Sequence, residues 1–521
     1  NNQYDDNGRV CSQVLWDGDA CRLEYGDSGD ETAIYTKEGT TIYQYTKEKM
    51  PLRIIYPDNT DICIRYNENN CCIYRKDRLG NEQYWDYDSY TRIIFEKKPS
   101  GLEVHYEYNP DGDLVKVWDN SGTETVYLYD ACHQMIEKRE LRDKEKQQWD
   151  VCTYAYDSMG RLIKKTSPSG KSVSYSYESG YGKPSYTVYE DGESVRREYD
   201  LMERMMVKED SCGSTEYGYN TRDDISLIRD GDGNETMRLY DSVGRLLYLY
   251  PPKADRQTGE GATRYRYNFM RHLEDIIYSD GSHEKTVVDW EGTVLKRIHP
   301  NAYDSEKDDG AGEVYDYNSD KKLIRIHYPD GGTERFFRDA AGNCIKHVLP
   351  EDYDLEKDDG RGYCYTYDAE NRLTQVTNPD GIIELVYHYD LRGNVISEQS
   401  ADGSTAYYWY DLLNQMIQKA EAISDKQGEV FYRRTCYVYD KDGNRIKEYR
   451  YGGSWRLVSG EPENSLELEQ DGQDLCLVYT YDARNRLICV KDGYGACIRY
   501  SYDIRGNRIS EEQKINEEVS K

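Results

Sequence analysis

The 521-residue chain has no apolar run of about twenty residues, so the sequence predicts no transmembrane helix. No signal peptide is visible either. Basic residues are outnumbered, because 68 Lys and Arg face 98 Asp and Glu, which gives a net charge of −30. Nucleic acids and anionic membrane surfaces attract basic patches, so we expect neither as a partner. A mean hydropathy of −0.96 predicts a thin sheet rather than a thick core.

Catalytic motifs are also missing. The chain has no P-loop, no Gly-x-Ser-x-Gly and no His-Glu-x-x-His segment. Gly26–Gly29 is similar to the nucleophile segment of trypsin-like proteases, but no histidine precedes Ser28. We therefore expect no catalytic residues, no cofactor-binding residues and a protein that is not an enzyme. The eight histidines are scattered singly along the chain: His105, His133, His272, His283, His299, His327, His347 and His388.

Metal sites find little support in the cysteines and carboxylates. No Cys-x-x-Cys is present, and Cys71-Cys72 is the only adjacent pair, so we expect no zinc site. Asp230–Glu235 begins like a calcium loop, but Glu235 stands where the sharp turn needs glycine. We interpret that segment as a hairpin turn and expect no metal ligands.

Two cysteine pairs straddle expected hairpin turns. They are Cys489 with Cys497 and Cys132 with Cys152. Cross-strand disulfides are one interpretation. Free thiols that act as small apolar residues are the alternative.

Phenylalanine is scarce and tyrosine abundant, with 5 Phe against 54 Tyr. Tyrosine followed by Asp or a small polar residue recurs about every twenty-one residues, which predicts a repeat architecture from end to end. The series comprises Tyr4, Tyr25, Tyr45, Tyr66, Tyr87, Tyr108, Tyr129, Tyr156, Tyr177, Tyr199, Tyr219, Tyr240, Tyr267, Tyr317, Tyr367, Tyr389, Tyr410, Tyr439, Tyr481 and Tyr502, while Val288 and Arg338 stand in for tyrosine.

One repeat reads as one β-hairpin with its connector. After Tyr156-Asp157 come two variable residues, then Gly160, Arg161 and a short apolar strand. A Pro/Asp/Gly-type turn follows, and the return strand Lys171–Tyr177 alternates with period two. The Asp is expected to accept backbone N–H bonds, and the Gly to adopt a positive φ. In Tyr-x-Tyr the two rings share one face of the sheet.

This pattern resembles the YD (rearrangement-hot-spot, RHS) repeat of bacterial polymorphic toxins, insecticidal toxin complexes and animal teneurins. Tyr-Asp-x-x-Gly-Arg-Leu at Tyr156–Leu162 and turns such as Pro379-Asp380-Gly381 carry the resemblance over nearly the whole chain, in roughly two dozen copies. It implies an all-β fold, in which a continuous strip of antiparallel hairpins spirals into an open or partly closed shell or barrel. Residues 1–521 are expected to be a single array, a fragment of a longer shell. The resemblance also includes self-cleaving members, but no Asp-Pro-x-Gly is present, so we do not expect self-cleavage.

Longer connectors interrupt the spacing of about twenty-one residues between repeat tyrosines. Pro300–Gly310 and Pro350–Gly360 are near copies, each with several carboxylates. Calcium loops are one interpretation, but the Asp-x-Asp-x-Asp-Gly spacing is missing, which favours lengthened hairpin tips. Residues 454–475 are expected to form a degenerate repeat with an exposed acidic loop.

The absence of catalytic motifs favours a structural role. The resemblance implies a non-catalytic shell that encapsulates and helps deliver a C-terminal effector domain, with that domain and flanking repeats as partners and a secreted or cell-surface location. The alternative is a cell-surface adhesion or carbohydrate-binding module, in which tyrosines stack on glycans or contact a protein.

Overall fold

The computed structural model describes residues 2–14, 20–37, 39–178, 182–424, 430–457, 466–471 and 474–514. The chain divides into two compact units, each built from two separate segments. Unit 1 comprises Asn1–His105 and Ala254–Val386, and unit 2 comprises Tyr106–Lys253 and Tyr387–Lys521. In each unit we call the first segment the early strip and the second the late strip.

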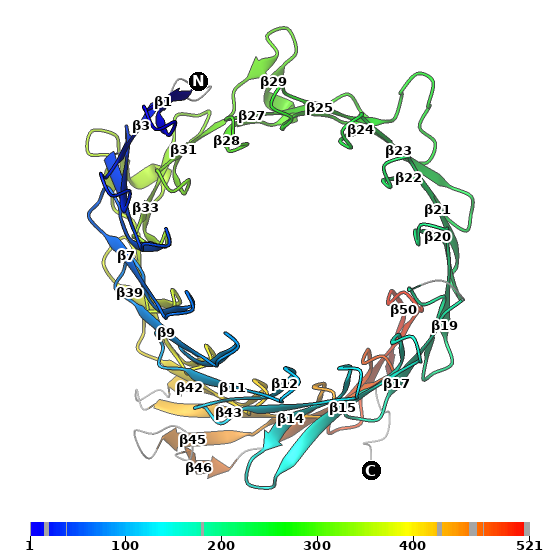
Figure 1. Ribbon diagram of the computed structural model, residues 1–521. Coiled ribbons are helices and arrows are strands. Elements are labelled where there is room, and N and C mark those ends of the chain that lie inside the picture. Colours follow the sequence, from blue (N-terminus) through cyan, green and yellow to red (C-terminus); the bar gives the residue numbers. More distant parts are fainter. Residues whose placement is uncertain are drawn as a thin grey trace. The chain divides into compact units, whose positions relative to one another are not determined.

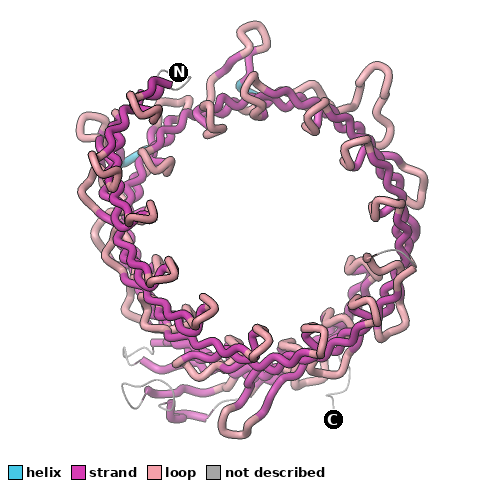
Figure 2. Tube along the Cα trace, viewed as in Figure 1, coloured by secondary structure: helices cyan, strands magenta, loops and turns pink. Residues whose placement is uncertain are grey.

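Nearly all regular structure is β-strand, and helix is limited to two single turns in the described part (Figure 2). Unit 1 contains β1 (Asn2–Tyr4), β2 (Val10–Val14), β3 (Ala20–Tyr25), β4 (Glu31–Thr36), β5 (Gly39–Tyr45), β6 (Pro51–Ile55), β7 (Asp61–Tyr66), β8 (Cys72–Lys76), β9 (Glu82–Tyr87), β10 (Ile93–Lys97), β25 (Thr263–Tyr267), β26 (Leu273–Ile277), β27 (His283–Val288), β28 (Val294–Ile298), η1 (Pro300–Ala302), β29 (Tyr303–Asp304), β30 (Asp309–Gly310), β31 (Glu313–Tyr317), β32 (Leu323–His327), β33 (Thr333–Arg338), β34 (Cys344–Val348), η2 (Pro350–Asp352), β35 (Tyr353–Asp354), β36 (Asp359–Gly360), β37 (Tyr363–Tyr367) and β38 (Leu373–Thr377).

Two strands cross from one unit into the other, β11 (Glu103–Tyr108) and β39 (Ile383–Tyr389). Unit 2 contains β12 (Leu114–Asp119), β13 (Glu124–Tyr129), β14 (Met135–Asp143), β15 (Gln148–Tyr156), β16 (Leu162–Thr166), β17 (Ser172–Ser176), β18 (Tyr186–Tyr189), β19 (Ser194–Tyr199), β20 (Met205–Asp210), β21 (Gly213–Tyr219), β22 (Ile225–Arg229), β23 (Glu235–Tyr240), β24 (Leu246–Tyr250), β40 (Val395–Ser400), β41 (Thr405–Tyr410), β42 (Met416–Ser424), β43 (Val430–Tyr439), β44 (Arg445–Arg450), β45 (Gly453–Leu457), β46 (Leu466–Asp471), β47 (Leu475–Tyr481), β48 (Leu487–Lys491), β49 (Cys497–Tyr502) and β50 (Arg508–Lys514).

Forty-six strands belong to one sheet, and the hairpins β29–β30 and β35–β36 stand outside it. Strands that follow each other in sequence pair antiparallel, as β15–β16 and β16–β17 do. Among the described strands, β1 pairs with β2 and β50 with β49, so the sheet is open. The predicted all-β strip of antiparallel hairpins is confirmed.

Within unit 1 the early strip lies beside the late strip, as the blue strands β7 and β9 and the green strand β33 illustrate (Figure 1). Residues 242 and 270 positions apart touch there, through Arg78 with Asp320 and Ser100 with Glu370. In unit 2 the equivalent contacts join residues 273 to 314 positions apart. The strip therefore stacks on itself within each unit.

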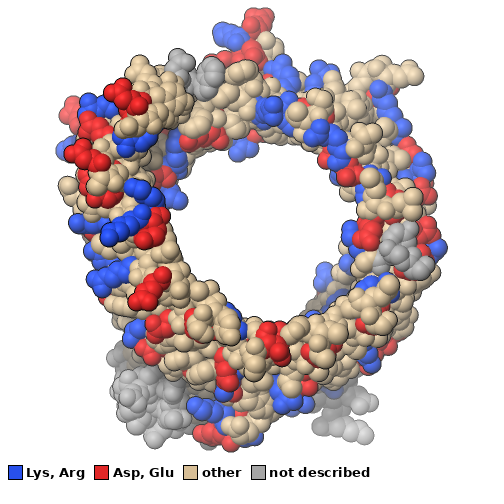
Figure 3. Space-filling view, viewed as in Figure 1, with Lys and Arg blue, Asp and Glu red and all other residues tan. Residues whose placement is uncertain are grey.

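Few side chains are fully buried, as the thin-sheet prediction requires. Unit 2 has a small cluster of Trp409, Ala420 and Tyr432, packed by Trp455. In unit 1 the most enclosed apolar residues are Ile298 and Val348, each 0% exposed. Acidic and basic side chains are interspersed on the face in Figure 3. Stability must therefore come largely from strand pairing and repeated local contacts.

The stretch 454–475, predicted as a degenerate repeat, contains the hairpin β45–β46. β44 skips this hairpin and pairs with β47, while Trp455 of β45 lies opposite Tyr432 of β43. The hairpin is thus an insertion that folds back on an earlier strand. The acidic loop predicted at its tip lies outside the described residues.

Candidate functional site: repeat turns, strip seam and cleft

Wherever the structure describes the segment after a repeat tyrosine, that segment is a five-residue turn, here called the YD turn, of which Asp157–Arg161 is representative. Asp157 Oδ1 accepts the N–H groups of Met159 and Arg161, both at 2.9 Å. Its Oδ2 accepts Arg161 Nε at 2.8 Å. Strand register slips by one residue between Ala155 and Tyr156, a bulge next to a tight turn. The prediction that the Asp caps the turn is confirmed.

The fourth residue after the repeat tyrosine has a positive φ in every YD turn described. Gly160 shows 81°, as predicted for a glycine at this place. Other repeats force non-glycine residues into the same conformation, and Thr91 at 63° is β-branched. The positive φ is thus retained at this position although the residue type varies.

The tyrosine hydroxyl has a specific acceptor. Tyr177 donates to the carbonyl of Leu162 at 2.7 Å, the sixth residue after the preceding repeat tyrosine. Arg338, which stands in for tyrosine, donates through Nε to the equivalent carbonyl of Leu323 at 2.8 Å. The same bond is made by Tyr25, Tyr66, Tyr87, Tyr129, Tyr156, Tyr219, Tyr240, Tyr317, Tyr367, Tyr410, Tyr439, Tyr481 and Tyr502.

The seam between early and late strips brings two kinds of turn together. We call the turn that joins the first strand of a repeat to its return strand a connector turn. YD turns of the late strip pack against connector turns of the early strip. In unit 2, Asp442 accepts the N–H of Ser169 at 3.0 Å and its hydroxyl at 2.5 Å. Arg505 binds Asp210 with both Nε and Nη2 at 3.0 Å.

Seam carboxylates are held ionised. Burial alone would raise the pKa of Asp442, but hydrogen bonds from Ser169 and Ser167 and the charge of Lys171 outweigh it and lower that pKa. Burial acts likewise on Asp210, and the hydrogen bond from Arg505 lowers its pKa. These pairs join segments far apart in sequence, and sequence reasoning did not identify them.

The two long connectors, earlier weighed as calcium loops, form small hairpins. Pro300–Ala302 makes one 3-10 turn, and Tyr303–Asp304 then pairs with Asp309–Gly310. Their carboxylates already have cationic partners, such as Lys285 for Asp308 at 2.7 Å. The Lys285 hydrogen bond lowers the pKa of Asp308 to about 2. The structure therefore confirms lengthened hairpin tips.

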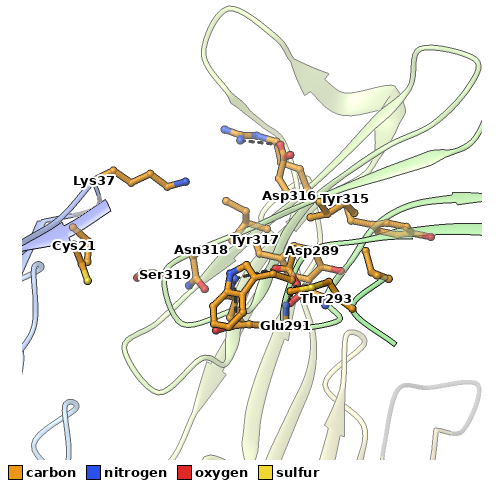
Figure 4. A pocket seen from close by; sticks show the side chains of 18 of the residues that line it. Cys21, Lys37, Asp289, Glu291, Thr293, Tyr315, Asp316, Tyr317, Asn318 and Ser319 are labelled. Atoms are coloured by element: carbon orange, nitrogen blue, oxygen red, sulfur yellow. Dashed lines mark hydrogen bonds and ion pairs between the residues drawn. The ribbon is translucent and has the colours of Figure 1, made fainter. Parts of the chain in front are cut away.

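A cleft of about 930 Å³ lies between the two strips of unit 1 (Figure 4). Lys37 and Cys21 reach it from the early strip, and Asn318 and Ser319 from the late strip. Four aromatic residues belong to its lining. They are Phe269, Trp290, Tyr315 and Tyr317.

Two carboxylates in the lining of the cleft share one lysine. Lys321 Nζ lies 3.1 Å from Asp289 and 3.3 Å from Glu291. Burial works against the charge of Asp289, but hydrogen bonds from Thr293 and Lys321 outweigh it and lower that pKa. A carboxyl of this kind stays ionised at neutral pH, so it suits hydrogen bonding to a ligand better than proton donation.

The cysteine pairs proposed from sequence are not brought together. Cys497 lies opposite Lys491, and Cys489 opposite Arg499, so the two cysteines are offset by two residues. Cys152 lies opposite Lys138, while Cys132 is in a YD turn. The disulfide interpretation is wrong, and all cysteines are free.

The remaining sequence motifs join no catalytic group. The Ser28 hydroxyl bonds Asp30 within its own turn. Asp230 caps the turn to Asn234 through its Oδ1, as a hairpin turn requires. No cluster of three metal-ligating side chains is found within the described ranges. Across those same ranges, no helix is long and apolar enough to cross a membrane.

Comparisons with known proteins also identify the repeat. The family model described as RHS Repeat matches residues 108–140 and 367–405. Probable deoxyribonuclease RhsB of Dickeya dadantii (strain 3937) is 24% identical over a region covering 31% of this chain and 11% of that protein.

Solved toxin-complex structures share the fold. TcdB2-TccC3-TEV matches with a TM-score of 0.57 at 12% identity, over 98% of this chain and 29% of that chain. TcdB2-TccC3-Cdc42 gives a TM-score of 0.58 at 14% identity, over 95% of this chain and 27% of that chain. The present chain thus spans less than a third of each of these proteins.

Hairpins capped by Tyr-Asp, repeated along one open sheet, define a YD-repeat protein. The family match at residues 108–140 and 367–405 and the shared fold support a protein built from RHS repeats.

Proposed function

We propose that this chain is part of a shell wall that encloses a C-terminal effector domain and helps deliver it. The observation that carries the proposal is the seam, because a strip that stacks on itself through paired turns makes a continuous wall. The shared fold with toxin-complex proteins supports this role. Wall-building needs no chemistry, so we assign no catalytic step to these residues. A secreted or cell-surface location accords with this role and forms part of the proposal.

The test begins with the coding sequence beyond both ends of this stretch. If a non-repetitive C-terminal domain follows, the complete polypeptide is expressed and treated with protease. Enclosure predicts that this domain resists digestion in the native protein and becomes sensitive when Arg505→Ala and Asp442→Ala loosen the seam. A complete polypeptide without such a domain contradicts enclosure. So does a C-terminal domain that protease digests at the same rate in the wild type and in the variant.

A second candidate is carbohydrate binding in the unit 1 cleft. Aromatic rings with nearby carboxylate and amide groups are the surfaces on which sugars stack and hydrogen-bond. A glycan array probed with wild type and with Trp290→Ala tests it. Binding lost in Trp290→Ala but kept in Tyr494→Ala, an exposed aromatic outside the cleft, supports the candidate. Absence of binding by wild type removes it.

A further inference from the structure

Three consecutive YD turns of the late strip in unit 2 contact three consecutive connector turns of the early strip. Each contact pairs one residue of a YD turn with one residue of a connector turn, namely Asp442 with Ser169, Arg484 with Asp191, and Arg505 with Asp210. The partners are 273, 293 and 295 positions apart in sequence. The seam is therefore held at three places in succession.

Along this stretch each strip is a continuous sheet. In the early strip, β16 to β21 pair in sequence order. In the late strip, β44 pairs with β47, and β47 to β50 follow in order. The backbone ladder ties together the three turns that each strip contributes, so one contact cannot open far while the other two stay closed.

The two strips of unit 2 are joined to each other by side chains. Within the described part of that unit, every strand pairing joins strands of one strip, and every other backbone–backbone hydrogen bond joins residues of one strip. The hydrogen bonds found across the seam use a side chain as donor or acceptor. Examples are Arg142 Nη2 to the Asp440 carbonyl at 2.9 Å and Lys171 Nζ to Asn485 Oδ1 at 2.7 Å. The strips can therefore part without the loss of a strand pairing.

Solvent is close to the contacts that hold the seam. The side chain of Arg505 is 38% exposed and that of Asp191 is 30% exposed. Ion pairs of this kind contribute little to stability individually, because water replaces the lost partner of each charge. Asp442 is only 2% exposed, but parting of the strips returns its carboxylate to water, which solvates the charge. Water thus offsets much of the loss of these contacts once the strips separate.

We propose that this seam is a latch, along which the two strips of unit 2 part as a unit while each strip keeps its own strand pairing. The inference rests on the proposed wall role, in which parting gives an enclosed domain a way out without unfolding of the wall. Opening that breaks only side-chain contacts should need less free energy than unfolding, which also breaks the ladder.

The amide of Ser169 reports the state of the seam directly, because its acceptor is Asp442 Oδ1 at 3.0 Å. Amides of β16 and β17, the strands that flank this turn, report the strand pairing. Residue-resolved hydrogen exchange, at urea concentrations below the unfolding transition, measures both. In wild type, the Ser169 amide is expected to exchange at least about tenfold faster than the slowest amides of β16 and β17.

Arg484→Ala combined with Arg505→Ala removes two seam contacts at a distance from the reporter. Parting as a unit predicts that Ser169 then exchanges about tenfold faster than in wild type, while the flanking strands change by less than about twofold. Arg508→Ala is the matched control, because Arg508 pairs with Glu511 of its own strand at 3.0 Å. It should leave both rates unchanged.

Circular dichroism first checks that each variant is folded. If the double variant does not fold, Arg505→Ala alone takes its place in the same comparison. An unchanged rate for Ser169 shows that the seam contacts open independently, and it overturns the latch. Equal acceleration of Ser169 and of the flanking strands also overturns it, because parting is then the same event as unfolding. So does an equal effect of Arg508→Ala.

Failure of the latch and failure of enclosure are distinguishable. Hydrogen exchange at Ser169 measures parting in this chain, whereas protease resistance of a C-terminal domain measures enclosure. Protection of that domain without cooperative parting of the strips leaves the wall role in place and removes only the latch.

Discussion

At the residue scale, the scarcity of phenylalanine has a direct explanation. Each repeat needs a ring that packs on the sheet and also donates one hydrogen bond to a carbonyl of the preceding repeat. Tyrosine supplies both, and stacked pairs such as Tyr248 with Tyr250, at 5.7 Å between centroids, confirm the predicted shared face. Arg338 shows that the donor matters, since it keeps the bond without the phenol ring.

Tyr177→Phe should lower the free energy of unfolding by about 1 kcal/mol, because the Leu162 carbonyl loses its donor while the packing is retained. Urea unfolding measures this. Tyr90→Phe is the control, because Tyr90 is 76% exposed in a turn and should shift stability by less than about 0.5 kcal/mol. Equal effects would show that the hydroxyl bond contributes nothing particular.

Thr91→Gly should raise the free energy of unfolding by about 1 kcal/mol, because a β-branched residue is strained at its φ of 63° and glycine is not. Ser89→Gly in the same turn should instead lower stability by about 0.5 kcal/mol, since it only loosens the unfolded chain. Paired urea titrations decide the sign. Destabilisation by Thr91→Gly would mean that the threonine side chain supports the turn.

At the element scale, the two long connectors belong to copies spaced by fifty residues, from Tyr267 to Tyr317. A cross-strand ion pair is kept with its polarity reversed. Arg266 pairs with Asp275 in the first copy, and Asp316 with Arg325 in the second. The register holds the same two positions opposite each other in both copies, so either order of charges satisfies the contact.

Gly360→Ala should destabilise unit 1 by about 3 kcal/mol, because the added Cβ would lie 2.0 Å from the Asp352 carbonyl oxygen and 2.8 Å from Val348. Gly493→Ala is the matched control, with its nearest atom at 3.7 Å. Thermal and urea unfolding of both variants give the comparison. A mild effect of Gly360→Ala would show that the small hairpin lifts away without cost to the strand beneath it.

At the scale of the whole molecule, stability in acid depends on carboxylates at the seam and at the hairpin tips. The folded-state pKa of Asp442 lies below the ordinary 3.8. The stability it contributes is therefore complete above about pH 4 and is lost as pH falls toward the lowered value. Asp358, whose pKa the Arg325 hydrogen bond lowers to about 2, loses its contribution in the same window.

Urea unfolding measured between about pH 5 and pH 2 should show stability falling steeply below about pH 4. Asp442→Asn should flatten that slope, since it removes one carboxyl that must be protonated. Glu145→Gln, an exposed side chain in the β14–β15 turn, should leave the slope unchanged. An unaltered slope in Asp442→Asn would place the acid sensitivity elsewhere.

The sequence by itself determined the local structure. The period of the tyrosines, the Asp that caps each turn and the residue with positive φ are set by neighbours a few positions away, so they can be read directly. Alternation of polarity identified the strands for the same reason. The register errors at Cys489 and Cys152 came from the one-residue bulge and turn placement, which sequence symmetry does not reveal.

Only the tertiary structure decided which turns meet. The partners of Asp442 and Arg505 lie 273 and 295 residues away, and the position they occupy varies freely within the repeat. The cleft of unit 1 likewise exists only because early and late strips stack. Local chemistry fixes a hairpin, but long-range stacking depends on how small twists add up over many hairpins, which no single repeat encodes.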